Sequence, residues 1–418
     1  MKTHIIVPLI ILIFLIAATI LVVLYGKGYR LTFNEKQPLI AKTGILVMSS
    51  TPNGAEVLIN GHLTTATDNT INLTPGTYDI KIQKDGYFAW EKKLKIQEEI
   101  VTKAEARLFP AAPKLESVAS TPVQNPIIDP SGTKIVFQIA SESAERKNGI
   151  YILNMAANII PIAILNLQSS SMQITDNTFD FFSRGRLTWS PDSTEILAQI
   201  PVTPDQSTFY LLTTSRFNDS PQDVTTILQS VYDSWNKQKL GSQRRLNANI
   251  NKNLSELINK NFRIIYWSPD ETKILYQASI SAQLPLIIKP RRPGNNTLVE
   301  ERKLTKNDIY IYDTKEDINI HLPVKLLDLC NTPDDLDSNS FEKCNLPLLW
   351  LADSKHLIYI NDKKIIIMDD DGSNNITLYA GPFLNTFAVP WPDSSRIVIL
   401  TNLGNPDTSP TLYTIGLK

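Results

Sequence analysis

The sequence predicts an all-β protein preceded by one apolar helix. Short apolar runs bounded by Pro, Asp, Asn, Ser and Gly make up most of the 418 residues, a pattern typical of strands joined by tight turns. Long helical periodicity is scarce after residue 26. A turn followed by an apolar strand also recurs through residues 113–418, which indicates a repeated β-unit.

Residues 5–25 contain no charged side chain, and as a helix they would span roughly 31 Å, close to the hydrocarbon thickness of a bilayer. Pro8 would lie in the first turn, where its missing N–H costs least. A cleaved signal peptide is the alternative, but its apolar region is shorter, about 7–15 residues, and residues 24–27 make a poor cleavage site. We therefore expect residues 1–26 to hold a single transmembrane anchor.

The charges beside this anchor do not settle its orientation. Lys2 lies on one side, and Lys27, Arg30 and Lys36 lie on the other, so counting basic residues does not favour an external body. An N-terminal hydrophobic anchor nevertheless commonly exports the chain that follows it. We expect a single-pass protein of the cell membrane with an extracytoplasmic body.

Composition argues against several partners and sites. Charged residues make up 20% of the chain and the net charge is −1, so we expect no nucleic-acid partner. The spacing of Cys330 and Cys344 leaves open both a disulfide in an oxidising compartment and a pair of buried thiols. Two cysteines without a nearby histidine cluster do not supply four zinc ligands, and we expect no cofactor.

Residues 27–43 are polar and predict a linker, whereas residues 44–110 predict a small β-sandwich. Asn60 and Gly61 favour a two-residue hairpin turn. Turn signals separate apolar strands in this segment, at residues 44–50, 55–59, 77–82 and 93–96.

Four motifs in this segment resemble the PEGA domain. They are Pro-Asn-Gly-Ala at 52–55, Asn-Gly at 60–61, Pro-Gly-Thr-Tyr at 75–78 and Gly-Tyr-Phe-Ala-Trp at 86–90. The first motif carries Asn53 where the family pattern has Glu, at a surface turn position. The resemblance implies an envelope- or surface-associated accessory module without catalytic residues. We expect its aromatic residues Tyr78, Tyr87 and Trp90 to pack in the sheets rather than to form a binding platform.

A turn–strand motif recurs five times in the rest of the chain. The copies are residues 130–137, 191–198, 269–276, 352–359 and 392–399. Trp189, Trp267 and Trp350 stand two residues before the Pro or Ala that opens their copy; Ile128 takes this place in the first copy, and Trp391 directly precedes the last. A second strand follows each copy, at residues 149–153, 208–212, 308–312, 364–368 and 411–415.

The order turn, strand, strand, repeated in this way, predicts the blades of a β-propeller over residues 113–418. The motif Trp-Ser-Pro-Asp-x-x-Lys-Ile-Leu resembles TolB-type, WD-like propeller repeats, which specifies a fold more than a function. We expect five blades and leave a degraded sixth open. Residues 114–120 are expected to supply the missing outer strand that closes the ring. Insertions are expected at 223–260, which has helical spacing, and at 279–307, which is proline-rich and basic.

The turn residues of the repeats are expected to be structural. Proline presets φ and aspartate bonds back to the backbone, which accounts for both residues without a metal or a reaction. The residues concerned are Pro130, Pro191, Asp192, Pro269, Asp270, Asp353, Pro392 and Asp393.

Few features suggest chemistry. The sequence has no Gly-x-Ser-x-Gly, no His-Glu-x-x-His and no phosphate-binding glycine loop. The acidic run at 369–374 favours a hairpin turn, with weak calcium binding as the alternative. The basic residues at 289–292 favour a solvated loop over a site for an acidic polymer.

We therefore expect a non-enzymatic protein of the cell envelope. The anchor would tether it to the membrane, the PEGA-like module would act as a spacer or adhesive unit, and the propeller would bind a protein or glycan through loops that meet at one end of its channel. The alternative is a propeller-type lyase or hydrolase acting on an envelope polysaccharide. An inward-facing cluster of Asp, Glu or His would favour that alternative.

Overall fold

The structure is a computed structural model that divides into two compact units, Met1–Ala111 with Ile288–Glu300, and Ala112–Ile287 with Glu301–Lys418. Cys330 and Cys344, and with them the expected disulfide, lie outside the described residues. The structure describes residues 3–26, 30–34, 37–119, 121–140, 145–156, 171–248, 250, 252–293, 296, 298–324, 348–384 and 387–418.

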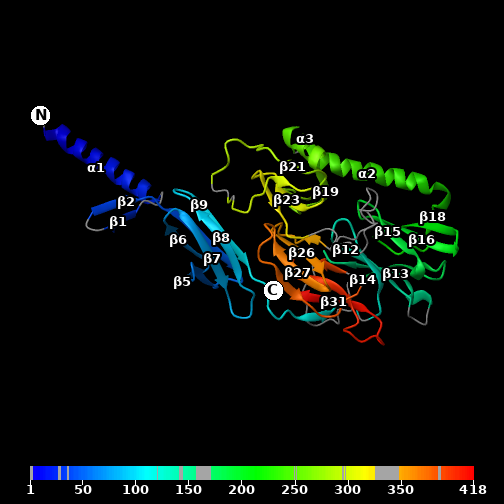
Figure 1. The fold of residues 1–418 in the computed structure, drawn as a ribbon. Helices are drawn as coiled ribbons and strands as arrows, with labels where there is room; N and C mark the ends of the chain where they lie inside the picture. Colours follow the sequence, from blue (N-terminus) through cyan, green and yellow to red (C-terminus); the bar gives the residue numbers. More distant parts are fainter. Residues whose placement is uncertain are drawn as a thin grey trace. The chain divides into compact units, whose positions relative to one another are not determined.

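Helix α1 spans Thr3–Gly26, with no acidic residue in its first turn and no basic residue in its last (Figure 1). Its large apolar side chains from Leu9 to Tyr25 are 51–71% exposed where described. The helical conformation predicted for residues 5–25 is therefore observed. No helix in the described part of the chain combines the length and the apolar character needed to cross a membrane, so the expected span is not confirmed.

The segment expected to be a linker contains two short strands. Strands β1 (Arg30–Asn34) and β2 (Gln37–Ala41) pair in antiparallel fashion. Their short length gave a weak strand signal, although residues 31 and 33 alternate with polar neighbours.

Two sheets form the sandwich predicted for residues 44–110. One sheet has the order β6-β3-β9 and the other β5-β4-β7-β8. Asn60 and Gly61 connect β4 to β5 with φ of 50° and 81°, as a two-residue hairpin turn with positive φ at both positions requires. The strands are β3 (Gly44–Thr51), β4 (Glu56–Ile59), β5 (His62–Ala66), β6 (Asn69–Leu73), β7 (Gly76–Gln83), β8 (Trp90–Ile96) and β9 (Val101–Arg107).

Alternate residues of these strands build one core. Leu46 and Met48 of β3 and Ile80 and Ile82 of β7 are buried within it, because side chains two apart on a strand share a face. Trp90 is buried in the same cluster, and the partly buried Tyr78 and Tyr87 pack against it.

In the described part of the second unit, five sheets have four antiparallel strands each, and we call them blades 1–5. Blade 1 is β11–β14, blade 2 is β15–β18, blade 3 is β19, β20, β23 and β24, blade 4 is β25–β28, and blade 5 is β29–β31 with β10. Their bounds are β10 (Leu115–Ser117), β11 (Gln124–Ile128), β12 (Lys134–Ile139), β13 (Gly149–Asn154), β14 (Ser171–Asp176), β15 (Arg186–Trp189), β16 (Glu195–Thr203), β17 (Gln206–Thr213), β18 (Gln222–Asp223), β19 (Phe262–Trp267), β20 (Lys273–Ala278), β23 (Ile309–Asp313), β24 (Ile318–His321), β25 (Leu348–Trp350), β26 (His356–Asn361), β27 (Lys364–Asp369), β28 (Ile376–Tyr379), β29 (Ala388–Pro390), β30 (Arg396–Thr401) and β31 (Thr411–Gly416).

The closure predicted from residues 114–120 is confirmed. Strand β10, which precedes blade 1 in the chain, pairs with β31 and becomes the fourth strand of blade 5. The first strands of blades 4 and 5 contact each other, which places first strands nearest the centre. A sixth blade is not found among the described residues.

Tryptophans of the repeat fill the space between neighbouring blades. Trp189 joins blade 2 to blade 1 in a buried cluster with Val136 and Ile150, and its Nε1 donates to the Ile127 carbonyl at 3.2 Å. Trp350 lies in the cluster that joins blades 3 and 4, and Trp391 lies in the cluster that joins blades 5 and 1. The recurring Trp therefore packs neighbouring blades against each other.

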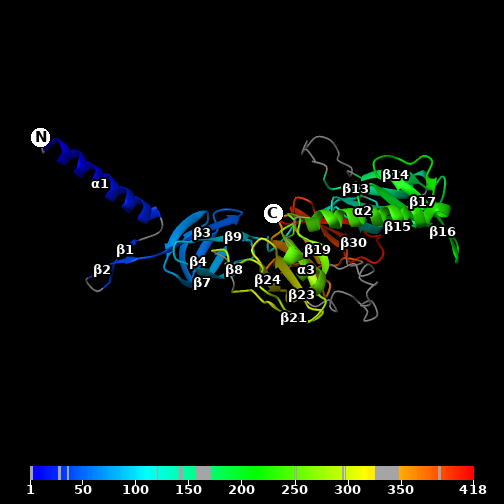
Figure 2. The ribbon, with the colours of Figure 1, turned by 90° about the horizontal axis from the view of Figure 1, so that it is seen from above.

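Both expected insertions are structured. Helices α2 (Leu228–Ala248) and α3 (Lys252–Asn261) connect β18 to β19 (Figures 1 and 2). The short strands β21 (Ala282–Gln283) and β22 (Lys303–Leu304) pair between β20 and β23. Short 3₁₀ turns lie at Glu145–Lys147, Phe182–Arg184 and Thr225–Ile227.

Candidate binding end of the propeller

The two ends of the blades differ in what they carry. In an antiparallel four-stranded sheet, connections 1–2 and 3–4 leave at one end, while connection 2–3 and the link to the next blade leave at the other. We call the end with the 1–2 turns the turn end, and the opposite end, which carries β21–β22 and residues 177–185 and 402–410, the insertion end. The link that holds α2 and α3 also leaves blade 2 at the insertion end, but α2 reaches the turn end, where it contacts Glu195 and Glu271. Variable loops at one end of a rigid scaffold are where binding residues usually lie.

The turn end holds all the repeat residues predicted to be structural. Asp192 Oδ1 accepts hydrogen bonds from Ser190 Oγ at 2.7 Å and from the Thr194 amide at 3.1 Å. Burial alone would raise the pKa of Asp192, but these hydrogen bonds outweigh it and the net shift is downward. The residues placed in these turns are Pro130, Pro191, Asp192, Pro269, Asp270, Asp353, Pro392 and Asp393.

Serines in three of these turns also bond to the neighbouring blade. Ser193 Oγ accepts from the Ser131 amide of blade 1 at 3.3 Å. Ser354 Oγ accepts from the Asp270 amide of blade 3 at 3.0 Å, and Ser394 Oγ accepts from the Ala352 amide at 2.8 Å. The three serines hold positive φ, between 56° and 61°. The turn end therefore links blades to one another and leaves little for a ligand.

The first strands of the blades offer little chemistry at the centre. All five are described, and none contains Asp, Glu or His. Their exposed positions are Gln124, Asn125, Arg186, Thr188, Ile264 and Tyr266. The carboxylate cluster that a propeller lyase or hydrolase would need is not built on these strands.

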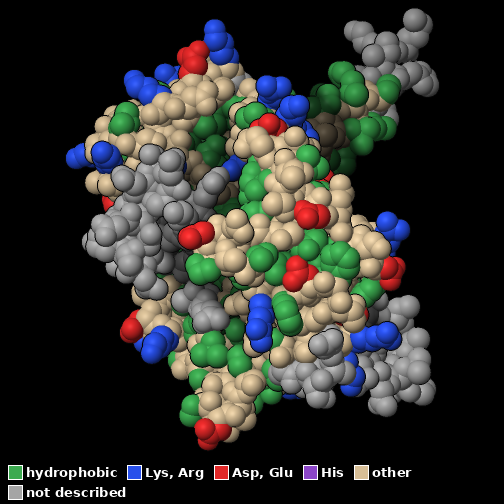
Figure 3. All heavy atoms as spheres, turned by 90° about the vertical axis from the view of Figure 1, so that its right-hand side faces the viewer, with side chains coloured by type: hydrophobic (Ala, Val, Ile, Leu, Met, Phe, Trp, Pro, Cys, Tyr) green, Lys and Arg blue, Asp and Glu red, His purple; other side chains and the backbone are tan. Residues whose placement is uncertain are grey.

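The insertion end exposes large apolar side chains on separate connections. Phe179 and Phe181, between β14 and β15, are 60% and 58% exposed. Val202 at the end of β16 is 63% exposed, and Leu403 between β30 and β31 is 52% exposed. Figure 3 shows one face of the molecule on which apolar side chains, in green, lie among polar atoms and scattered acidic and basic side chains.

The loop that carries the two phenylalanines is held firmly. The buried Gln138 of blade 1 donates through Nε2 to the carbonyls of Phe182 and Gly185 at 2.9 and 2.6 Å. The Phe179 ring lies edge-on to Tyr210, with centroids 5.9 Å apart. Burial and a hydrogen bond to Asp180 raise the pKa of Tyr210 to about 12, so its hydroxyl remains a donor to that loop. Exposed rings on a fixed loop suit recognition because little ordering remains to be done on binding.

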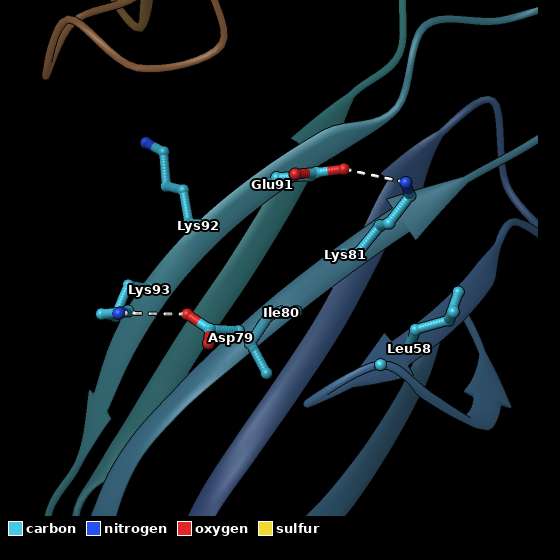
Figure 4. Close-up of a pocket in the computed structure, with 8 residues that line it drawn as sticks. Leu58, Asp79, Ile80, Lys81, Glu91, Lys92 and Lys93 are labelled. Carbon is cyan, nitrogen blue, oxygen red and sulfur yellow. Dashed lines mark ion pairs between the residues drawn. The ribbon is translucent and has the colours of Figure 1, made fainter.

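An open hollow of about 320 Å³ lies on the sandwich, over β4, β7 and β8 (Figure 4). Lys81 and Glu91 pair across it at 2.9 Å, and Lys93 and Asp79 pair at 3.5 Å. Lys92 Nζ lies 5.5 Å from the centroid of the Trp90 ring. Each charged side chain of the hollow therefore already has a partner within the sheet.

The acidic run at 369–374 has partners within the protein and does not form a separate binding site. In the acidic run, Asp369 Oδ1 lies 3.4 Å from His356 Nε2, Asp370 pairs with Lys273 at 2.6 Å, and Asp371 accepts from the Ser373 amide at 3.0 Å. This run forms the predicted turn between β27 and β28. No cluster of three metal-binding side chains occurs in the described ranges.

The basic segment is not a plain solvated loop. Arg291 pairs with the buried Glu300 at 2.7 Å. Further along the sequence, Arg302 forms a buried ion pair with Asp317 at 2.8 Å, which the sequence did not predict. The two residues lie 15 positions apart, and no periodic signal connects them.

Comparison with known proteins identifies a domain within the first unit. Residues 43–111 match the family model of the PEGA domain, which confirms the resemblance of the four motifs. No curated protein matches the chain. Solved structures found to be similar are TolB and other β-propeller proteins, as the repeat motif predicted.

Three of these solved structures share 10–14% sequence identity with this chain. A putative TolB from Agrobacterium tumefaciens is 14% identical, with a TM-score of 0.21, 72% of this chain and 75% of that chain covered. The propeller domain of the Trilobed protease from Pyrococcus furiosus is 13% identical, with a TM-score of 0.22; the match covers 90% of this chain and 95% of that chain. An oligogalacturonate lyase in complex with manganese is 10% identical, with a TM-score of 0.20; the match covers 85% of this chain and 82% of that chain. At these scores the propeller assignment rests on the strand order alone.

Proposed function

We propose that this chain is a membrane-tethered, extracytoplasmic envelope protein that binds a protein or glycan partner and catalyses no reaction itself. Helix α1 would be the tether, the PEGA domain a spacer or adhesive unit, and the insertion end of the propeller the binding surface. The observation that carries the proposal is the contrast between exposed apolar side chains at the insertion end and first strands without Asp, Glu or His.

The character of α1 supports the tether. The sequence from Ile5 to Tyr25 carries no charged side chain, as a segment in contact with lipid requires. Its mid-helix hydroxyl, on Thr19, donates to the Leu15 carbonyl at 2.7 Å, so this polar group is already satisfied for burial in lipid.

Exposed aromatic anchors support a partner at the insertion end. A few buried aromatic residues usually carry most of the energy of a protein interface, and aromatic rings also stack on sugars. Phe179 and Phe181 come from one fixed loop, so both can enter the same contact.

The experiment is a binding measurement with the full-length protein in nanodiscs, against glycan arrays and cross-linked envelope proteins. Replacing Phe179 and Phe181 together by Ala is expected to weaken binding about tenfold or more, since each anchor contributes over about 1 kcal/mol. Leu63→Ala, which removes an equally exposed apolar side chain (67%) from the PEGA domain, is the matched control and should bind like the wild type.

The enzyme alternative makes the opposite forecast. A propeller-type lyase or hydrolase would cleave envelope polysaccharides with the purified full-length chain, and its activity would depend on carboxylates rather than on the two phenylalanines. Steady polysaccharide turnover, with unchanged binding in the double variant, would replace the binding proposal by the enzymatic one.

A further inference from the structure

The junction between blades 2 and 3 is packed differently from its neighbours. Apolar clusters join blade 1 to 2, blade 3 to 4 and blade 5 to 1 directly. On blade 2, however, Leu197 packs with Val231 and Trp235 of α2. On blade 3, Tyr276 and Tyr310 pack with three residues of α3, Leu254, Leu257 and Ile258. They also pack with Leu284, which follows β21, and with Leu304 of β22. The insertions thus cover the blade faces that meet another blade elsewhere in the ring.

At the junction of blades 2 and 3, an ion pair takes the place of the hydrogen bond that links the turns of neighbouring blades at three other junctions. Ser193, Ser354 and Ser394 accept an amide hydrogen bond from the preceding blade. Blade 3 has Glu271 at this position, with the same positive φ of 57°. Glu271 Oε1 instead lies 2.9 Å from Arg245 Nη2 of α2. A bond between blades is therefore replaced by an ion pair from blade to helix.

Helix α2 is attached unevenly along its length. Its first half is fixed to blade 2 by the buried Val231 and Trp235, and Trp235 Nε1 donates to Glu195 of β16 at 3.5 Å. Residues 239–248 are exposed apart from the half-buried Leu246. Figures 1 and 2 both show α2 running from blade 2 to α3 beside blade 3. The side chains of Arg245 and Glu271 are 68% and 38% exposed.

We infer that the junction between blades 2 and 3 is a hinged seam in the ring. Helix α2 moves with blade 2, α3 moves with blade 3, and the Arg245–Glu271 ion pair is the latch between them. An exposed ion pair is weak and is screened by salt, whereas apolar clusters and hydrogen bonds from a backbone amide to a serine hydroxyl close the neighbouring junctions. The ring therefore widens here first, and this inference stands independently of the proposed function.

The test measures distances across two junctions in the full-length protein, with Cys330 and Cys344 replaced by Ser. Spin labels on Asp205→Cys and Lys315→Cys report on the seam, and labels on Lys315→Cys and Lys363→Cys report on the junction of blades 3 and 4. All three positions are exposed. We expect a broader distance distribution across the seam, which widens further at high salt.

Glu271→Gln breaks the latch and should raise the open population about two- to fivefold, the worth of an exposed ion pair. The exchange of Arg245→Glu with Glu271→Arg should restore the original distribution. Ser354→Ala is the matched control: it should affect the blade 3–4 distances and leave the seam unchanged. Equal widths at both junctions, or a Glu271→Gln seam indistinguishable from the wild type, would overturn the inference.

Discussion

Asp317 holds three segments of blade 3 together. Its Oδ1 accepts from Arg302 Nη2 at 2.8 Å and from the Tyr312 hydroxyl at 2.7 Å, and its Oδ2 accepts from the Ile287 amide at 2.7 Å. The Arg302 and Asp317 side chains are only 9% and 3% exposed. Burial and the bond to Asp317 raise the pKa of Tyr312, so that hydroxyl remains a donor. The buried carboxylate of Asp317 is tolerated because three hydrogen-bond donors, one of them charged, satisfy its oxygens.

Asp317→Ala is expected to lower the free energy of unfolding of the propeller by about 3–5 kcal/mol, since Arg302 would remain buried without its counter-charge. Denaturant unfolding followed by tryptophan fluorescence measures this loss. Glu256→Ala removes one partner of the exposed pair with Lys252 in α3 and should cost at most about 1 kcal/mol. Equal losses in the two variants would show that the buried network contributes no special stability.

At the scale of single elements, α1 is the part whose role depends most on its surroundings. Its apolar side chains are exposed all along the described helix, and exposed apolar area of this extent is unfavourable in water. Insertion into lipid would remove that cost.

Replacing Leu12 and Ile16 by Lys is therefore expected to move the full-length protein from the carbonate-resistant membrane fraction to the soluble fraction, because each central lysine costs about 2.5–3.5 kcal/mol on insertion. The substitutions Leu12→Ala and Ile16→Ala, which keep the helix, are the control and should leave the protein in the membrane. A wild-type protein that carbonate extracts completely would contradict the tether.

Repetition made most elements predictable from the sequence. Each turn–strand copy carries its own signal, and five copies reinforce one another, so the blades and their closure by β10 follow from the pattern. The contacts of the insertions do not follow from it. The spacing of Val231 and Trp235 indicates that one face of α2 is buried, but not that blade 2 buries it. Likewise, Arg302 and Asp317 meet only after β21 and β22 fold back on blade 3.

The candidate site was predictable only as a region. Loops at one end of the channel were expected to bind, but exposure of Phe179, Phe181 and Val202 depends on which end each connection leaves from. A single Phe in a sequence is more often buried than exposed. Tertiary structure, not local pattern, separates the buried Phe182 from the two exposed rings beside it.

At the scale of the whole molecule, strand β10 closes the ring of blades through its backbone. Its residues pair as Leu115 with Ile415, Glu116 with Thr414 and Ser117 with Tyr413. The Gly416 amide donates to the Lys114 carbonyl at 2.9 Å, and the Val118 amide donates to the Leu412 carbonyl at 2.9 Å. The side chains of β10 are all exposed, so apolar burial adds little to this closure.

This pairing pattern predicts that substitutions in β10 affect stability through its backbone hydrogen bonds rather than through its side chains. Because residues 114 and 118 face β31, the residue midway between them, Glu116, faces it too, and Leu115 presents its amide to the other side. Glu116→Pro removes an inward donor and should lower the stability of the propeller by about 1–3 kcal/mol. Leu115→Pro removes an outward amide and should cost less. If thermal unfolding shows equal losses, or none for Glu116→Pro, the ring does not depend on β10 for its closure.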